Sequence, residues 1–144
     1  MTPEEIVRVW ETHTRAEFEL KDVDAVMATV TDDVTNYNVP VGVGARGFEA
    51  VRAYYRDVFI ASLPDDWQVA FVNRVVGEDQ LVDEVHITLT HTKQMDWLIP
   101  GVPPTGRRVF TDAVAIVSFR DGKVCGERIY WDQLSVLRQV GVLS

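Results

Sequence analysis

The spacing of apolar residues in the first half of the chain predicts three helices and one strand. Thr2, Pro3 and Glu5 form a typical helix start, with a threonine cap, a proline in the first turn and a glutamate three residues after the cap. Apolar residues then recur every three or four positions as far as Leu20, which is the period of a helix with one buried face. The predicted helices span residues 2–20, 22–30 and 48–63, and the predicted strand spans residues 34–39.

The second half of the chain has the pattern of a β-meander. Apolar and polar residues alternate with the period of two that a half-buried strand requires. Asp121 and Gly122 form a strong hairpin signal between the last two strands. The predicted strands span residues 67–76, 81–92, 109–119 and 124–131, and a short helix follows at residues 134–140.

Helices followed by an antiparallel meander predict an α+β fold. The length of 144 residues suits one domain, so we expect a single domain over residues 1–144. A strongly curved sheet wrapped over one layer of helices leaves a cavity between the two layers. Such a cavity is the expected place for a small ligand.

The charge and the cysteine content exclude several classes of function. The net charge is −8, and the chain has no cluster of Lys and Arg, so nucleic acid and anionic membrane surfaces are not expected partners. The single cysteine, Cys125, cannot form an internal disulfide. The N-terminus lacks the pattern of a signal peptide, and no apolar run reaches the length of a membrane span. We therefore expect a cytoplasmic protein.

Four segments resemble the SnoaL-like polyketide cyclases, a family with the nuclear transport factor 2-like fold. They are His91, the loop 100–107, the hairpin turn 121–124 and the tail 134–141. The resemblance implies a cone-shaped α+β barrel, with three N-terminal helices packed on a curved, mostly antiparallel sheet that encloses a pocket. It also implies a homodimer with one pocket per subunit, and proton-transfer chemistry on carbon skeletons without a metal or an organic cofactor.

The family's own catalytic pair is not present in this sequence. In the cyclases, an aspartate on the last strand is the acid/base and a histidine on the preceding strand assists it. The resemblance places Ile129 and Ala115 at these two positions. Neither side chain can carry a proton, so any acid/base chemistry must use other residues.

A second set of polar residues provides candidates for that chemistry. The register inferred from the family turns Glu84 and His86 of the third strand and Glu127 of the last strand into the pocket. A histidine between two carboxylates is a plausible general base, because each carboxylate raises its pKa while burial lowers it. We therefore expect His86 to be the base, Glu84 to orient it and Glu127 to bind a substrate oxygen. The alternative is a polar pair that only supports the sheet.

Five further residues are candidates for ligand binding. Asn38 matches the water-holding asparagine of limonene epoxide hydrolase, and Ile129 and Trp131 share the pocket face of the last strand with Glu127. His13 either reaches the pocket mouth or pairs with a glutamate one turn later at the edge of the first helix. Trp97 lies in an apolar loop segment that forms either a lid or part of a dimer interface.

These observations predict a small-molecule enzyme that performs acid/base chemistry on an apolar carbonyl compound. Cyclisation, isomerisation and dehydration are the reaction types considered. Two alternatives remain open: a non-catalytic ligand-binding or accessory domain that has lost the family acid, and an epoxide or lactone hydrolase.

Overall fold

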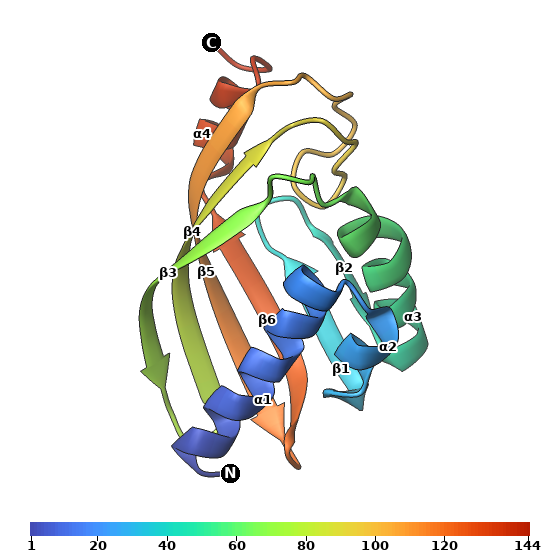
Figure 1. The fold of residues 1–144 in the computed structure, drawn as a ribbon, viewed down its shortest axis with the longest axis vertical. Helices are drawn as coiled ribbons and strands as arrows, with labels where there is room; N and C mark the ends of the chain where they lie inside the picture. Colours follow the sequence, from blue (N-terminus) through green and yellow to red (C-terminus); the bar gives the residue numbers. More distant parts are fainter.

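A layer of helices covers one face of a six-stranded sheet in the computed structural model, which describes residues 1–144 (Figure 1). The chain forms the elements in the following order: α1 (Pro3–Arg15), η1 (Ala16–Leu20), α2 (Val23–Met27), β1 (Val30–Asn38), β2 (Val43–Arg46), α3 (Phe48–Ala53), η2 (Tyr54–Phe59), η3 (Ile60–Ser62), β3 (Gln68–Val76), β4 (Gln80–Thr90), β5 (Arg108–Arg120), β6 (Lys123–Trp131) and α4 (Gln133–Gln139). The predicted α+β class is confirmed.

The strand order is β2-β1-β6-β5-β4-β3, and every pair is antiparallel except β1 and β6. Successive hairpins therefore build the sheet from β3 to β6, while the earlier β1 pairs with the last strand. The short edge strand β2, in a segment that the sequence assigned to a loop, pairs with the end of β1 through residues 43–46. Gly44 permits this pairing, because a Cβ at this position would lie 2.1 Å from the carbonyl oxygen of Asn36.

The helices begin where the sequence predicts, but two of them change from α-helical to π-helical geometry along their length. Thr2 and Glu5 form the reciprocal capping box of α1, and Asp22 caps α2. The helix of α1 continues as the π-helix η1, and α3 continues as the π-helix η2. π-helical segments are rare in proteins, and those that occur are often found at functional sites. Both segments contribute a polar side chain to the interior, Glu17 from η1 and Tyr55 from η2.

The loop between β4 and β5 is folded inward. Met95, Trp97, Leu98 and Ile99 are at most 3% exposed and belong to the main hydrophobic core. These side chains are buried within the subunit, so the interpretation of the segment as a dimer interface is wrong. Trp97 lines the pocket, and the interpretation as a lid stays a prediction. His91 anchors the loop, because its Nδ1 lies 3.0 Å from the hydroxyl of Thr105 and its backbone N–H donates to the carbonyl of Arg107.

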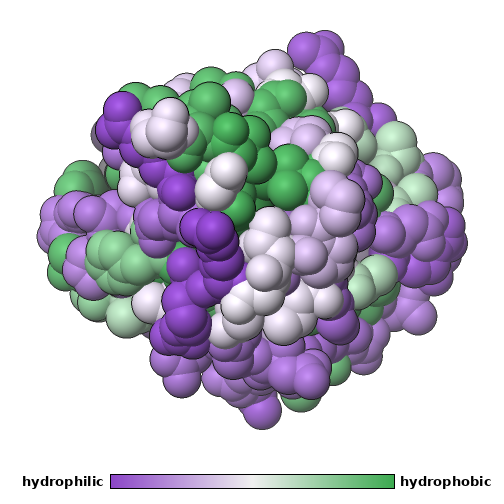
Figure 2. Space-filling view, turned by 90° about the horizontal axis from the view of Figure 1, so that it is seen from above, coloured by the Kyte–Doolittle hydropathy of each residue, from purple (hydrophilic) through white to green (hydrophobic).

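The chain termini lie at opposite ends of the molecule, and α4 stands beside the C-terminus (Figure 1). Seen from above, the surface shows an apolar patch among mainly hydrophilic side chains (Figure 2). Leu134, Val142 and Leu143 are exposed large hydrophobic residues of α4 and the C-terminal segment. None of the helices combines the length and the apolar character that a membrane crossing requires.

Candidate active site

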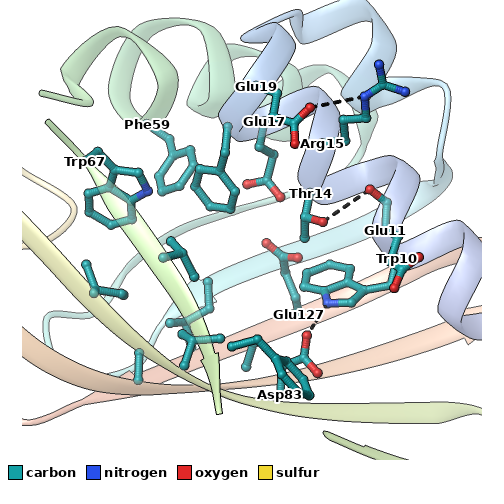
Figure 3. Close-up of a pocket in the computed structure, with 18 of the residues that line it drawn as sticks. Trp10, Glu11, Thr14, Arg15, Glu17, Glu19, Phe59, Trp67, Asp83 and Glu127 are labelled. Carbon is teal, nitrogen blue, oxygen red and sulfur yellow. Dashed lines mark hydrogen bonds and ion pairs between the residues drawn. The ribbon is translucent and has the colours of Figure 1, made fainter. Parts of the chain in front are cut away.

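A pocket of about 580 Å³ lies between the helices and the concave face of the sheet. Twelve of its 20 lining residues are hydrophobic, and Phe59 and Trp67 lie on one side (Figure 3). Trp97 packs against both of them, with ring centroids 4.8 and 5.6 Å away, and completes an aromatic wall. Two carboxylates, Glu17 of η1 and Glu127 of β6, project into the same space. The pocket therefore combines an apolar body with an acidic inner surface, which is the composition of a small-molecule site.

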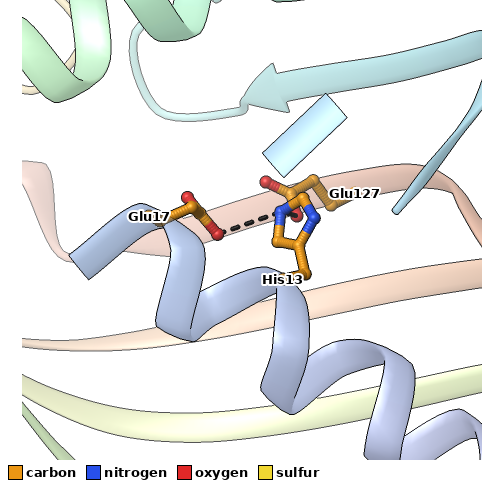
Figure 4. Close-up of side chains that lie close together, drawn as sticks. All are labelled: His13, Glu17 and Glu127. Atoms are coloured by element: carbon orange, nitrogen blue, oxygen red, sulfur yellow. Dashed lines mark ion pairs between the residues drawn. The ribbon is translucent and has the colours of Figure 1, made fainter. Parts of the chain in front are cut away.

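Three buried ionisable side chains meet at this acidic surface (Figure 4). His13 is completely buried, and Glu17 and Glu127 are each 4% exposed. The Nε2 of His13 lies 2.9 Å from Oε1 of Glu17 and 3.6 Å from Oε2 of Glu127. The sequence alternative of a His13–Glu17 pair is thus confirmed, although the pair lies in the interior rather than at the edge of the helix.

The hydrogen bonds of His13 determine which ring nitrogen faces the carboxylates. The hydroxyl of Thr29 donates to the carbonyl of Val26 at 2.7 Å, so its oxygen is free to accept. The Nδ1–H of His13 donates to this oxygen, also at 2.7 Å. Nε2 is then surrounded by oxygen atoms, from Glu17, Glu127 and the hydroxyl of Tyr55 at 3.2 Å. This surrounding favours a protonated Nε2.

The pKa of His13 agrees with this assignment. Burial lowers the pKa, but the charge and hydrogen bond of Glu17, together with the charge of Glu127, outweigh burial and leave the pKa raised above its ordinary value. The indole ring of Trp10 stacks on the imidazole with a centroid distance of 5.0 Å. A cation is stabilised over the face of an indole, so this contact also favours the imidazolium.

Glu127 has two carboxylate oxygens in different environments. Oε1 accepts a hydrogen bond from Nδ2 of Asn36 at 2.6 Å and one from the hydroxyl of Tyr55 at 3.0 Å. Oε2 is buried at the pocket wall and has no hydrogen-bond partner. A buried polar atom without a partner is unusual and calls for an explanation. The simplest one is that Oε2 is the atom that carries a proton or meets a ligand.

The protonation of Glu127 is balanced near neutral pH. Burial raises the pKa, and the charge of Glu17 raises it further, whereas His13, Tyr55 and Asn36 lower it. The result is a pKa of about 7, compared with an ordinary value of 4.5. A carboxyl group with such a pKa can both donate and accept a proton at physiological pH, which is the property of a general acid/base.

Asp83 and Arg74 form a second charged group in the lining of the pocket. Asp83 of β4 is 6% exposed and receives two hydrogen bonds from the guanidinium of Arg74, at 2.7 and 3.0 Å. The indole N–H of Trp10 donates to the same carboxylate at 2.8 Å (Figure 3). Asp83 therefore fixes Trp10, and Trp10 in turn covers the imidazole of His13.

The predicted placement of two catalytic candidates is wrong. Asp83 of β4 lines the pocket with Val85 and Ile87, and strand alternation therefore turns Glu84 and His86 to the opposite face. His86 is partly exposed there and forms an ion pair with Asp112 of the neighbouring strand β5. The predicted group of His86, Glu84 and Glu127 therefore does not exist, because only Glu127 faces the cavity.

The structure separates the ligand-binding candidates into two groups. Ile129 and Trp97 line the pocket, as expected from their predicted places. Asn38 and Trp131 do not: Asn38 is buried behind the wall, where its Nδ2 donates to the hydroxyl of Tyr54 at 2.7 Å, and Trp131 packs edge-on against Trp97. His13 contributes through the buried cluster and not at the pocket mouth.

Four residues of the site were not identified from the sequence: Glu17 as a pocket residue, Asn36, Tyr55 and Asp83. A signal existed for one of them. Asp83 stands in a regular alternation with Leu81, Val85 and Ile87, so the apolar face of this strand already pointed to the interior. Asn36 and Tyr55 had no comparable signal, because their partner Glu127 is 91 and 72 residues away.

The curved six-stranded sheet covered by helices is the fold of nuclear transport factor 2-like proteins. The chain belongs to the SnoaL-like polyketide cyclase family, whose sequence pattern matches residues 7–140. Ile129 and Ala115, which the resemblance assigns to the cyclase acid and its histidine, pair with each other across β5 and β6 and both line the pocket.

Solved structures with the same fold include several different proteins. TsrD from Streptomyces laurentii is 22% identical, with 99% of each chain covered and a TM-score of 0.75. A SnoaL-like protein from Jannaschia sp. CCS1 is 21% identical over 96% of this chain and 94% of that chain, with a TM-score of 0.76. An LEH-like epoxide hydrolase from M. tuberculosis is 18% identical over 95% of this chain and 90% of that chain, with a TM-score of 0.70. No curated protein sequence matches the chain.

Proposed function

We propose that this protein is an enzyme that moves protons on an apolar carbonyl compound, without a metal or an organic cofactor. Glu127 is the acid/base, and the observation that carries the proposal is its buried, unpartnered Oε2 at the wall of an apolar pocket. The cyclase family supports proton-transfer chemistry, and the solved neighbours include an epoxide hydrolase. Fold alone does not select a reaction, so the assignment depends on the geometry of the site.

The other residues of the cluster act on Glu127. Asn36 and Tyr55 hold Oε1, so that the proton of the neutral acid lies on Oε2, the oxygen without a protein partner. The His13–Glu17 ion pair places a negative and a positive charge beside Glu127, and these have opposite effects on its pKa. The aromatic wall positions a ring system in contact with this group. Abstraction of a proton next to a carbonyl, followed by its return at another carbon, gives isomerisation, and the same abstraction starts cyclisation or dehydration.

An exchange experiment tests the proposal without knowledge of the natural substrate. Deuterium incorporation at the carbon next to the carbonyl of tetralone is followed by NMR in D₂O, with and without protein. Wild type is expected to accelerate exchange, and Glu127→Gln is expected to reduce the acceleration by about 10²–10⁴-fold, the usual contribution of a positioned acid or base.

The sheet provides matched controls on its other face. Glu84→Gln removes a carboxylate from β4, and His86→Gln removes an imidazole that does not reach the pocket, so both are expected to exchange at the wild-type rate. His13→Gln, in contrast, is expected to lower the rate. The positive charge of His13 lowers the pKa of Glu127, so its removal leaves less of Glu127 in the ionised form that accepts a proton. Equal rates in wild type and Glu127→Gln would contradict the proposal.

The second candidate function is ligand binding without catalysis. It is favoured by Ile129 and Ala115, which give the pocket wall two apolar side chains at the positions of the cyclase acid and its histidine. The same experiment separates the two candidates. A pure binding domain would bind tetralone but leave its exchange at the rate of the buffer.

A further inference from the structure

Acidic side chains outnumber basic ones around the pocket, and the basic ones are already paired with acids of the protein. Seven ionisable side chains line it, five acids and two arginines: Glu11, Arg15, Glu17, Glu19, Arg74, Asp83 and Glu127. Both arginines are already engaged. Arg15 pairs with Glu19 at 3.3 Å, and Arg74 binds Asp83 and also reaches Glu11 at 3.2 Å.

The imidazole of His13 is engaged in the same way. Its Nδ1–H is used on Thr29 and its Nε2 lies against Glu17. Every positive group at the pocket therefore has an acidic partner from the protein. Among the ionisable side chains of the pocket, only Glu127 has a buried atom, Oε2, without a hydrogen-bond partner, and Glu127 is 4% exposed. The indole N–H of Trp67 is a further buried group of the lining without a partner, and it is a neutral donor.

This imbalance determines the charge of a suitable ligand. An anionic ligand would meet no free cation and would be repelled by Glu17 and Glu127. A purely apolar ligand would fill the cavity but leave Oε2 without a hydrogen bond, which is costly for a buried oxygen. A ligand with a positively charged nitrogen would supply the missing donor. The aromatic side chains of the pocket, among them Trp10, Trp67 and Trp97, also stabilise a cation.

We propose that the pocket binds an amine in its protonated form, with an apolar ring body against the aromatic wall and an ammonium N–H donated to Oε2 of Glu127. This inference rests on the proposed function and names the substrate class of the same site. A bound ammonium holds Glu127 in its ionised form. Its N–H uses one lone pair of Oε2, and the second lone pair of Oε2 accepts the proton from a neighbouring carbon. The charge of the ligand then sets the state of the acid/base group.

Three ring compounds that differ only in their polar group test this proposal by isothermal titration calorimetry. Naphthylmethylamine is expected to bind about 10- to 100-fold more tightly than naphthylmethanol, as a charge-assisted hydrogen bond exceeds a neutral one. Naphthoate is expected to bind most weakly. In Glu127→Gln the preference for the amine over the alcohol should fall to less than about 3-fold, whereas Glu84→Gln should retain it.

A second measurement on the wild type does not depend on a variant. Near neutral pH, binding of the ammonium should release a fraction of a proton from Glu127, which appears as a dependence of the binding enthalpy on the ionisation enthalpy of the buffer. The proposal is overturned if the amine does not bind at millimolar concentration, if the alcohol binds equally well, or if the preference survives in Glu127→Gln. The exchange assay uses an uncharged ketone and calorimetry needs no turnover, so failure of one proposal is distinguishable from failure of the other.

Discussion

Replacement of Glu127 by glutamine should change the dependence of stability on pH. The glutamine side chain has the same shape, and its Oε1 can still accept the hydrogen bonds of Asn36 and Tyr55. It cannot ionise. The variant therefore isolates the free energy that the folded protein loses when it must hold Glu127 as a buried anion.

The sign of the effect follows from the raised pKa. Glu127 has a pKa of about 7 in the folded protein, compared with an ordinary value of 4.5. Between these values the folded protein retains a proton that the unfolded chain has released. The free energy of unfolding of the wild type consequently falls as the pH rises through this window, and the loss is complete above about pH 7.

The magnitude is obtained from the same two values. At about 1.4 kcal/mol per pH unit, the difference between 4.5 and about 7 corresponds to about 3 kcal/mol. We therefore expect Glu127→Gln to become more stable relative to wild type by about 3 kcal/mol between about pH 4.5 and pH 8. His13 contributes in the same direction in both proteins, because its raised pKa gives stability at low pH that is lost as the pH rises. The comparison of variant and wild type largely removes this contribution.

Urea denaturation at a series of pH values measures the effect. The free energies of unfolding of wild type and variant are extrapolated to water at each pH, and their difference is plotted. Glu84→Gln, on the opposite face of the sheet, should follow the wild type within about 0.5 kcal/mol throughout. A constant difference between Glu127→Gln and wild type would show that burial does not raise the pKa of Glu127, and the reasoning about the acid/base group would then fail.

Three other predictions concern His13, the sheet edge and the assembly. Thr29→Val leaves the Nδ1–H of His13 without an acceptor and should cost about 1–3 kcal/mol in urea denaturation, whereas Thr29→Ser should retain most of this stability. Gly44→Ala should cost more than about 3 kcal/mol, since the new Cβ would collide with the backbone at Asn36, while Gly77→Ala, with its nearest atom at 3.4 Å, should cost less than about 1 kcal/mol. We also propose that the protein is a homodimer: sedimentation velocity at micromolar concentration should give about twice the chain mass of 16.3 kDa, and a clean monomer would refute this.

Most of the fold was predictable because local signals and the family resemblance agree. The capping box at Thr2 fixes the start of α1, and the turn at Asp121 and Gly122 joins β5 and β6. The edge strand β2 was not predictable from its composition, because Gly44 reads as a loop residue. A glycine is required at position 44 because the carbonyl of Asn36 approaches its Cα closely, and only the folded backbone reveals this approach.

The site was only partly predictable, for a reason that lies in strand alternation. Alternation identifies two sets of residues on β4 but does not say which set faces the interior. The set with His86 contains more ionisable side chains, whereas the set with Val85 and Ile87 is more apolar. The apolar set faces the interior, because burial of apolar side chains stabilises the fold. Asp83 is the polar exception in that set, and it is tolerated because Arg74 and Trp10 satisfy its carboxylate.

In the proposed function, the acid/base group lies on the same strand as the position that the resemblance assigns to the cyclase acid. Glu127 and Ile129 lie two residues apart on β6 and both face the pocket, so an acid has a place on the same wall without a change of backbone. Its partner must then come from elsewhere, because the β5 residue opposite Glu127 is Val117. In our proposal this partner is His13 of α1, whose Nε2 lies 3.6 Å from Oε2 of Glu127 on the helix side. Glu127 and His13 thus come from two layers of the fold instead of two neighbouring strands, and the acid/base group that we propose lies beneath the helices and near Trp10, which stacks on His13.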